Sequence, residues 1–498
     1  MPDYKDQYLP FWEWELLGDH LEVANLADKG DLHPATERIV LSRVEDYSIA
    51  LKLTGKNASP VSLKSKPTPK RGEEYKPKEV VGTGLDGSII KVIGAVVPGL
   101  RIKPDGELSG EGSAFQVVVD YQTGKASQTR SLWCLNGPDD MIPWRSTRRT
   151  SGKDVKRERE SMTGDGELKQ SWKGTTFSSS AADHWRLKVG GDEVILGQVP
   201  SEFGPNWSKN MSVEFRTLST WCRQKDGEKG LLEGLSFIVG KRLIPIGSTD
   251  YFDGSHPVSQ TAVKAWGLNL KAECSNPADP PINLQANDTF TELDPIGSSI
   301  VTKYLDLRDE FSLSETIWMY WLSKIVPLGS GLVYLSASLE NLMNACYHSV
   351  KSKSKGAYLD TDTWNGFLKA PLELLENNLG QTKYADRILG RVKRANALGV
   401  NEKFEFFFEE IGLPIGDVER AAIKSRNVFA HGGNLDLRKI ELVVEATSAF
   451  KVLINRALLK MFGYTGKYID YSTLGFPERD LDQPLGGSDG SGKPIRTK

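Results

Sequence analysis

Short runs of alternating apolar and polar residues fill the first 300 positions of the chain. They are SIALKL at 48–53, FQVVVDY at 115–121, TRSLWCL at 129–135, HWRLKV at 184–189, MSVEFRTL at 211–218, LSFIVG at 235–240 and VKAWGLNL at 263–270. Alternation with a period of two, rich in β-branched and aromatic residues, predicts strands. Because Gly, Pro, Ser and Asp separate many short strands, we expect a β-rich N-terminal domain over 1–290, folded as a sandwich or barrel.

The hydrophobic period changes after residue 310. Leu335, Leu339 and Leu342 recur at intervals of four and three, which places them on one face of a helix. Asn401 and Asp417 stand where helix N-caps are expected. The predicted helices cover 314–327, 329–351, 363–379, 383–399, 401–412, 416–433 and 436–462.

The resulting fold class is α+β and multidomain. An all-α helical bundle over 310–470 follows the β-rich domain. Residues 471–498 end in GGSDGSGKPIRTK, whose composition predicts a disordered tail.

Composition narrows the possible functions. The chain has 498 residues, of which 39% are hydrophobic and 26% charged, as in ordinary globular proteins. Its formal net charge of −2 excludes a protein that coats nucleic acid by bulk positive charge, because such domains are strongly basic. A local basic site remains compatible with this charge.

The cysteines and the apolar runs argue against several further classes. Cys134, Cys222, Cys274 and Cys346 form no CxxC pair and no spacing suited to zinc, so we expect neither a metal nor another cofactor. The chain starts without the pattern of a secretory signal. The longest apolar stretch, 92–100, is far too short to span a bilayer. We therefore expect a cytoplasmic protein with no membrane partner.

Three polar or basic segments are open to two interpretations. Residues 62–79 and 144–167 are charged and poor in apolar anchors, which is typical of solvated loops, although the second has enough arginines to contact a phosphate backbone. The third segment, KYADRILGRVKR, places Lys383, Arg387 and Arg391 along one predicted helix face, and Lys393 and Arg394 follow them. That row is either a solvated face or a stripe that binds RNA phosphates.

Candidate chemistry lies in the string SRNVFAHGG, which contains Arg426, Asn427 and His431. Five residues of helix separate Arg426 and His431 by about 140° around the axis, so they do not share a face of a regular helix. A shared site requires the last turn to deviate at the two following glycines, or a second copy of the helix to complete it by symmetry.

These side chains match the needs of RNA cleavage without a metal. The reaction needs a base for the 2′-OH, an acid for the leaving 5′-oxygen and a cation for the charge that develops on phosphorus. His431 at a helix C-terminus can exchange protons, and Arg426 can hold a phosphate through two hydrogen bonds, with Asn427 beside it. The alternative is that Arg426 forms a surface salt bridge and His431 only caps its helix.

The context of RNVFAH resembles the HEPN superfamily, whose signature is R-x4-6-H with a polar residue after the Arg. AAIKSRNVFAHGG and the closing LLKMFGYTGKY are most similar to the ApeA-like branch, in which a β-rich domain precedes the HEPN domain. The resemblance covers about 310–470 by motif and helix order, and only the architecture agrees over 1–300.

The resemblance implies a metal-independent endoribonuclease that leaves a 2′,3′-cyclic phosphate. It implies a homodimer through the HEPN domain, cleavage of tRNA or another structured RNA, and a role in abortive infection with a phage-derived trigger at the N-terminal domain. Arg426, His431 and Asn427 are the implied catalytic residues. Lys424 and Glu340 fit the pattern less closely and are candidates for substrate binding, as is the basic row. The alternative is a non-catalytic HEPN module that dimerises while the β-rich domain binds a ligand.

Overall fold

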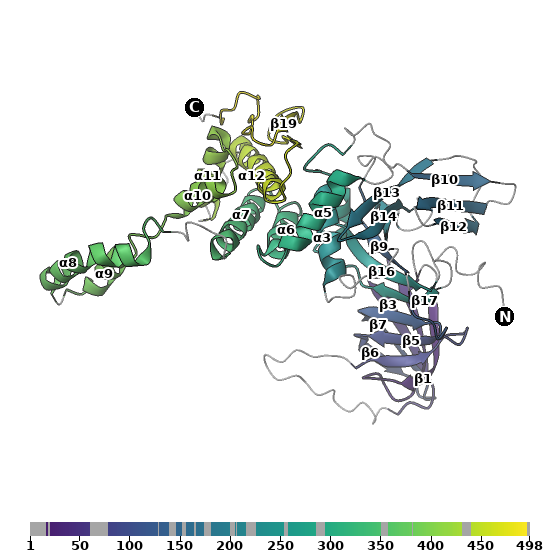
Figure 1. Ribbon diagram of the computed structural model, residues 1–498. Coiled ribbons are helices and arrows are strands. Elements are labelled where there is room, and N and C mark those ends of the chain that lie inside the picture. The colour runs from purple at the N-terminus through teal and green to yellow at the C-terminus, as the bar shows by residue number, and fades with distance from the viewer. Residues whose placement is uncertain are drawn as a thin grey trace. The chain divides into compact units, whose positions relative to one another are not determined.

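The protein is described by a computed structural model. The residues it describes are 16–17, 20–59, 78–127, 129–138, 146–151, 156–163, 166–173, 181–199, 205, 207–215, 226–252, 257–284, 294–349, 357–380, 382–430 and 440–495. The chain divides into two compact units. The first unit contains Met1–Pro280 and Leu284–Thr302, and the second contains Pro281–Asn283 and Lys303–Lys498. The first is rich in strands and the second in helices, which confirms the α+β class (Figure 1).

The first unit contains a 17-stranded antiparallel sheet. Its strands are β1 (Leu21–Asp28), β2 (Thr36–Arg43), β3 (Ile49–Gly55), β4 (Val80–Thr83), β5 (Ile89–Ile93), β6 (Val96–Ile102), β7 (Leu108–Ala114), β8 (Gln116–Asp120), β9 (Thr129–Leu135), β10 (Ser146–Ser151), β11 (Lys156–Thr163), β12 (Gly166–Lys173), β13 (Ala181–Val189), β14 (Asp192–Gln198), β15 (Asn210–Phe215), β16 (Ile244–Tyr251) and β17 (Pro257–Val263).

Strand β1 pairs with two different strands at different points along its length. The first residues of β1 pair with β2, whereas Ala24 and Asp28 pair with β4, and the register shifts between these two residues. Buried side chains from β1, β3 and β5, such as Val23, Leu51 and Val92, belong to one hydrophobic core. The alternation seen in β3, where every second residue is buried, therefore has a direct structural cause.

Three predictions for the first unit are wrong. Residues 235–240, predicted as a strand, belong to helix α3 (Gly227–Val239), and the run 263–270 follows β17 and ends where helix α4 (Leu270–Ser275) begins. The charged segment 144–167, interpreted as a solvated loop, contains β10, β11 and the first residues of β12. A short apolar run does not by itself distinguish a buried helix from a buried strand.

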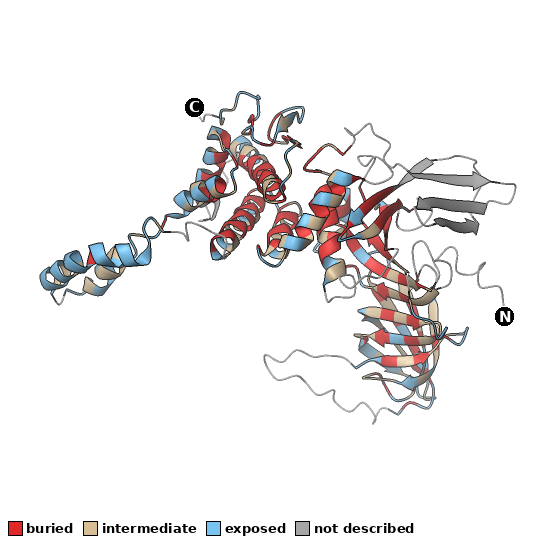
Figure 2. Ribbon diagram, viewed as in Figure 1, coloured by how far each residue is buried: buried red, intermediate tan, exposed pale blue. Residues whose placement is uncertain are grey.

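The second unit is built from helices. They are α5 (Pro295–Leu307), which starts in the first unit, α6 (Leu313–Leu322), α7 (Ser330–His348), α8 (Thr361–Leu379), α9 (Ala385–Lys393), α10 (Val400–Glu410), α11 (Asp417–Ala430) and α12 (Ile440–Met461). All seven predicted helices are present, although α9 is shorter than expected. The faces of α7 and α12 that carry Leu339 and Leu453 are buried (Figure 2).

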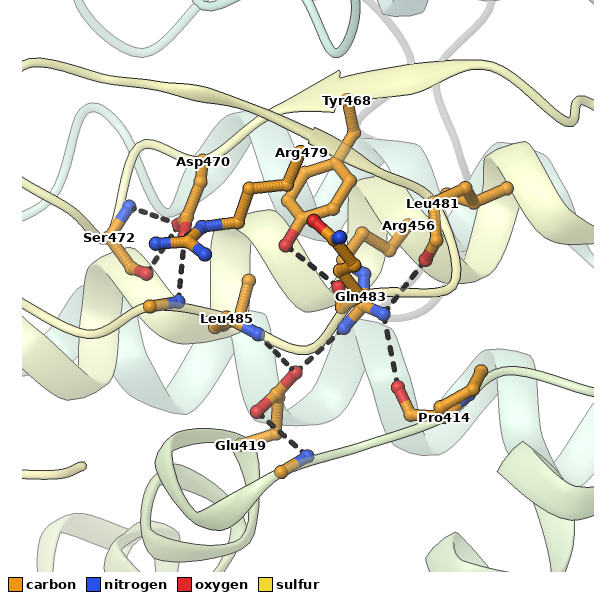
Figure 3. Close-up of polar contacts among 12 residues, drawn as sticks. Pro414, Glu419, Arg456, Tyr468, Asp470, Ser472, Arg479, Leu481, Gln483 and Leu485 are labelled. Carbon is orange, nitrogen blue, oxygen red and sulfur yellow. Dashed lines mark hydrogen bonds and ion pairs between the residues drawn. The ribbon is translucent and has the colours of Figure 1, made fainter. Parts of the chain in front are cut away.

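The C-terminal residues pack against α11 and α12, so the prediction of a disordered tail is wrong for 471–495. Strands β18 (Lys467–Ile469) and β19 (Glu478–Asp480) pair with each other. The carboxylate of Asp470, fully buried, accepts hydrogen bonds from the Arg479 side chain at 2.9 Å and from the Gly486 N–H at 2.8 Å (Figure 3). Glycine-rich composition did not reveal this single buried carboxylate, which organises the segment.

A fully buried ion pair joins α12 to α11, and both of its members also bond to the same segment. The guanidinium of Arg456 lies 2.7 Å from the Glu419 carboxylate, and both side chains have no exposed surface. Arg456 also donates to the Leu481 carbonyl at 2.9 Å, and the Glu419 carboxylate accepts the Leu485 N–H at 2.9 Å (Figure 3). The first turn of α11 is therefore held by α12 and the C-terminal segment together.

Within the described ranges, no helix is both long enough and apolar enough to span a membrane.

Candidate functional site

Arg426 lies on α11 and faces side chains from two other helices. Its side chain is buried, with 7% of its surface exposed. Glu340 comes from α7, whereas Asn401 and Phe404 come from the start of α10. The helical period explains this placement, because Val418, Ala422 and Arg426 recur every four residues on the buried face of α11.

The guanidinium of Arg426 has three partners among the described residues. Its Nε lies 3.2 Å from the Glu340 carboxylate, and its Nη1 donates to the Asn401 side-chain oxygen at 2.9 Å. Its centre lies 5.2 Å from the centroid of the Phe404 ring. An ion pair, a neutral hydrogen bond and a cation–π contact thus fix the plane of the guanidinium.

The Glu340 side of this cluster is open to solvent. Its side chain is 38% exposed, although the arginine that it pairs with is buried. The Ser336 hydroxyl, one turn earlier on α7, lies 3.5 Å from the same carboxylate oxygen. The carboxylate half of the ion pair therefore contacts solvent, whereas the guanidinium is buried.

The structure describes little of the other two predicted catalytic residues. Asn427 follows Arg426 on α11, but its side chain lies outside the described part. His431 also lies outside the described residues, directly after Ala430, the last residue of α11. The expected separation of Arg426 and His431 around the helix axis therefore stays a prediction.

Lys424 does not join the Arg426 cluster. Two residues along a helix turn the direction of the side chain by about 200°, so Lys424 and Arg426 point to opposite sides of α11. Lys424 is exposed, in agreement with this geometry. A role for Lys424 in binding substrate would require a second surface of α11.

The predicted basic row lies on a helical hairpin formed by α8 and α9. Arg387 and Arg391 are on α9, whereas Lys383 and Arg394 lie in the turns that flank it. All four are exposed. The contacts of Arg426 described above come from α7 and α10, so the structure assigns the row and the Arg426 cluster to different elements.

Asn401 and Phe404 are the members of the cluster that sequence reasoning missed. Asn401 was expected as the N-cap of its helix, but Gly399 has that position, and the Glu402 side chain accepts the Gly399 N–H at 2.7 Å. That hydrogen bond, together with one from the Tyr358 hydroxyl, lowers the pKa of Glu402. The run FEFFF showed only that α10 is apolar, and no local signal paired it with α11.

Thiol chemistry is not supported at the described cysteines. Cys134, Cys274 and Cys346 are buried, and burial raises the pKa of the thiol in each, to about 11 in Cys274 and Cys346. A protonated thiol is a poor nucleophile at neutral pH. Within the described ranges, no group of three or more His, Cys, Asp and Glu side chains is arranged to hold a metal ion.

Comparisons with known proteins give no match. Neither a protein-family model, nor a curated protein, nor a solved structure is similar to this chain.

Proposed function

We propose that the helical unit is a HEPN-type endoribonuclease that cleaves RNA without a metal ion. In this mechanism the 2′-oxygen attacks phosphorus while a base takes its proton, and the bond to the 5′-oxygen breaks as an acid protonates it. The products are a 2′,3′-cyclic phosphate and a 5′-hydroxyl. His431 is the proton-transfer group, and Arg426 binds the charge that develops on the phosphate. Asn427 orients the phosphate or the imidazole.

The orientation of Arg426 carries this proposal. A buried guanidinium fixed by Glu340, Asn401 and Phe404 is preorganised, which is what an electrostatic catalyst requires. The carboxylate of Glu340 is the partner that phosphate displaces or shares, because it is the exposed member of the pair. His431 follows the same helix after one further turn.

The wider role that we propose follows the same resemblance. The enzyme acts as a homodimer in abortive infection and cleaves tRNA or another structured RNA. The β-rich unit senses a phage-derived trigger or restrains the nuclease. Expression of the wild-type chain in bacteria is then expected to arrest growth, while His431→Ala does not.

A second candidate is a non-catalytic HEPN module that dimerises. The burial of Arg426 and its ion pair with Glu340 favour this candidate equally, because buried arginines also serve to fix helices together. Under this candidate the β-rich unit binds a ligand, and the RNVFAH string has only a structural role.

The test is cleavage of total RNA and of purified tRNA by the full-length protein in EDTA. We expect defined cuts with cyclic-phosphate ends from the wild type, and a loss of at least 100-fold in rate for His431→Ala and Arg426→Ala, the size typical of removing a general base or an oxyanion-stabilising group. Arg420→Ala is the matched control, since Arg420 is an exposed arginine on the same helix that pairs with Glu405.

Each outcome separates the two candidates. Undiminished cleavage by folded His431→Ala would show that the assigned site is wrong. If the wild type cuts no RNA, while Arg426→Ala loses dimerisation in light scattering, the non-catalytic module is correct. Circular dichroism of every variant distinguishes a lost catalyst from an unfolded helix.

A further inference from the structure

The exposed face of α9 has an unusual concentration of positive charge. Arg387 and Arg391 lie one turn apart on the helix, about 6 Å along its axis. Lys383 precedes Arg387 by four residues, and Arg394 caps the C-terminal end. We call these four residues the α9 basic row.

The α9 basic row has no carboxylate partners among the described residues. None of its members forms an ion pair there, whereas arginines elsewhere in the helical unit, such as Arg420 and Arg479, do. Like charges one turn apart repel each other and weaken an exposed helix. The arrangement therefore lowers the stability of α9 unless an anion outside the hairpin neutralises it.

Apolar and aromatic side chains lie beside the cations. Tyr384 is 54% exposed and Ile388 is 39% exposed, both on α9 or the turn before it. The ammonium of Lys383 lies 5.9 Å from the centre of the Tyr384 ring. Cations next to an exposed ring fit a strand with phosphates on one side and free bases on the other, because a base can stack on the ring.

Few residues of the hairpin formed by α8 and α9 are buried. Leu368 is the only buried residue of α8, and α9 has none (Figure 2). Phe367 and Leu374 on α8 are also exposed, at 68% and 64%. A hairpin with this composition is better suited to contact another molecule than to support the bundle.

We propose that the α9 basic row binds a single-stranded segment of RNA through its phosphates, with an unpaired base stacked on Tyr384. The choice of RNA rests on the proposed ribonuclease function. The row does not discriminate between RNA sequences, because its cations contact the RNA phosphates and any base can stack on the Tyr384 ring. It holds the substrate strand, and the Arg426 cluster performs the reaction.

The test measures binding of a fluorescent single-stranded RNA to full-length His431→Ala, which separates binding from cleavage. R387E/R391E is expected to weaken binding at least tenfold and to flatten the salt dependence by about 1.4 in the slope of log K against log salt, since two phosphate contacts are lost. Tyr384→Ala is expected to weaken binding about tenfold through lost stacking. K369E/K393E is the control, because it changes the same charge on the same hairpin outside the row.

Three results would overturn the proposal. Unchanged affinity in R387E/R391E would show that the row is a solvated face. An equal loss of RNA affinity in K369E/K393E would show that only the net charge of the hairpin matters. Competition by poly-glutamate as effective as competition by RNA would indicate an acidic protein partner. Cleavage by the wild type is scored separately, so unchanged RNA affinity in R387E/R391E with wild-type cleavage intact refutes this inference and leaves the nuclease in place.

Discussion

Arg426 and Arg456 are two buried arginines that differ in the exposure of their partners. Arg456 pairs with Glu419, whose side chain is 0% exposed, and its remaining hydrogen bonds go to backbone carbonyls. Arg426 pairs with Glu340, which is 38% exposed. The first pair is closed within the fold, whereas the carboxylate of the second contacts solvent. This difference is why Arg426, and not Arg456, is assigned to a functional site.

Breaking the closed pair should be costly. Glu419→Gln removes the charge that compensates Arg456 and leaves a buried cation, so we expect the free energy of unfolding to fall by about 3 kcal/mol. Glu405→Gln, which breaks the exposed pair with Arg420, is expected to cost at most about 1 kcal/mol. Urea denaturation of both variants, followed by far-UV circular dichroism, checks the contrast. Equal losses would mean that burial does not distinguish the pairs.

The sequence predicted Arg426 and Glu340 as candidates but not the contacts between them. Helical periodicity places a residue on a face, and it does not say which other helix packs there. Asn401 was expected as a helix cap, although its side chain accepts a hydrogen bond from Arg426. The contacts of Arg426 with Asn401 and Glu340 join residues 25 and 86 positions apart, beyond any local pattern.

At the scale of elements, amphipathic patterns succeeded where one face alone is buried. The helices from α6 to α12 form where they were predicted, with α9 shorter than expected, and an apolar stripe at helical spacing marks those that bury one face, such as α7 and α12. The pattern failed for α3, where Gly230 through Leu232 and Gly234 through Val239 are all buried and no polar face marks the period. It failed also for 471–495, where the buried carboxylates of Asp470 and Glu419 accept backbone N–H groups of a segment that has no helical or strand period.

The α8 and α9 hairpin should unfold locally when its one buried contact is removed. Leu368→Ala is expected to cost about 2 kcal/mol, at the low end for a core leucine, because little else holds the hairpin. Phe367→Ala, the exposed neighbour, should change stability by less than about 0.5 kcal/mol. Hydrogen exchange over 361–393 is the measurement. We expect faster exchange there in Leu368→Ala, with α12 unaffected, and protection equal to that of the wild type would contradict the assignment.

For the whole molecule, the two units each have buried residues of their own. The sheet core contains residues from Leu16 to Cys274, all within the first unit. The helical unit has its own buried set, in which α12 contributes Phe450 and Leu453 with no exposed surface. The proposed function, with a sensing part and a catalytic part, would use such a division, because each part could hold its structure while the other changes.

Separate cores predict two cooperative unfolding transitions. Leu51→Ala and Leu453→Ala each remove a fully buried leucine, one from β3 and one from α12, and each should cost about 2–5 kcal/mol. Because the cores share no residues, each variant is expected to lower the melting temperature of one transition by several degrees and to leave the other unchanged. Differential scanning calorimetry of the full chain measures both. A single transition that moves in both variants would show instead that α5, which continues from the first unit into the second, couples the two units into one cooperative body.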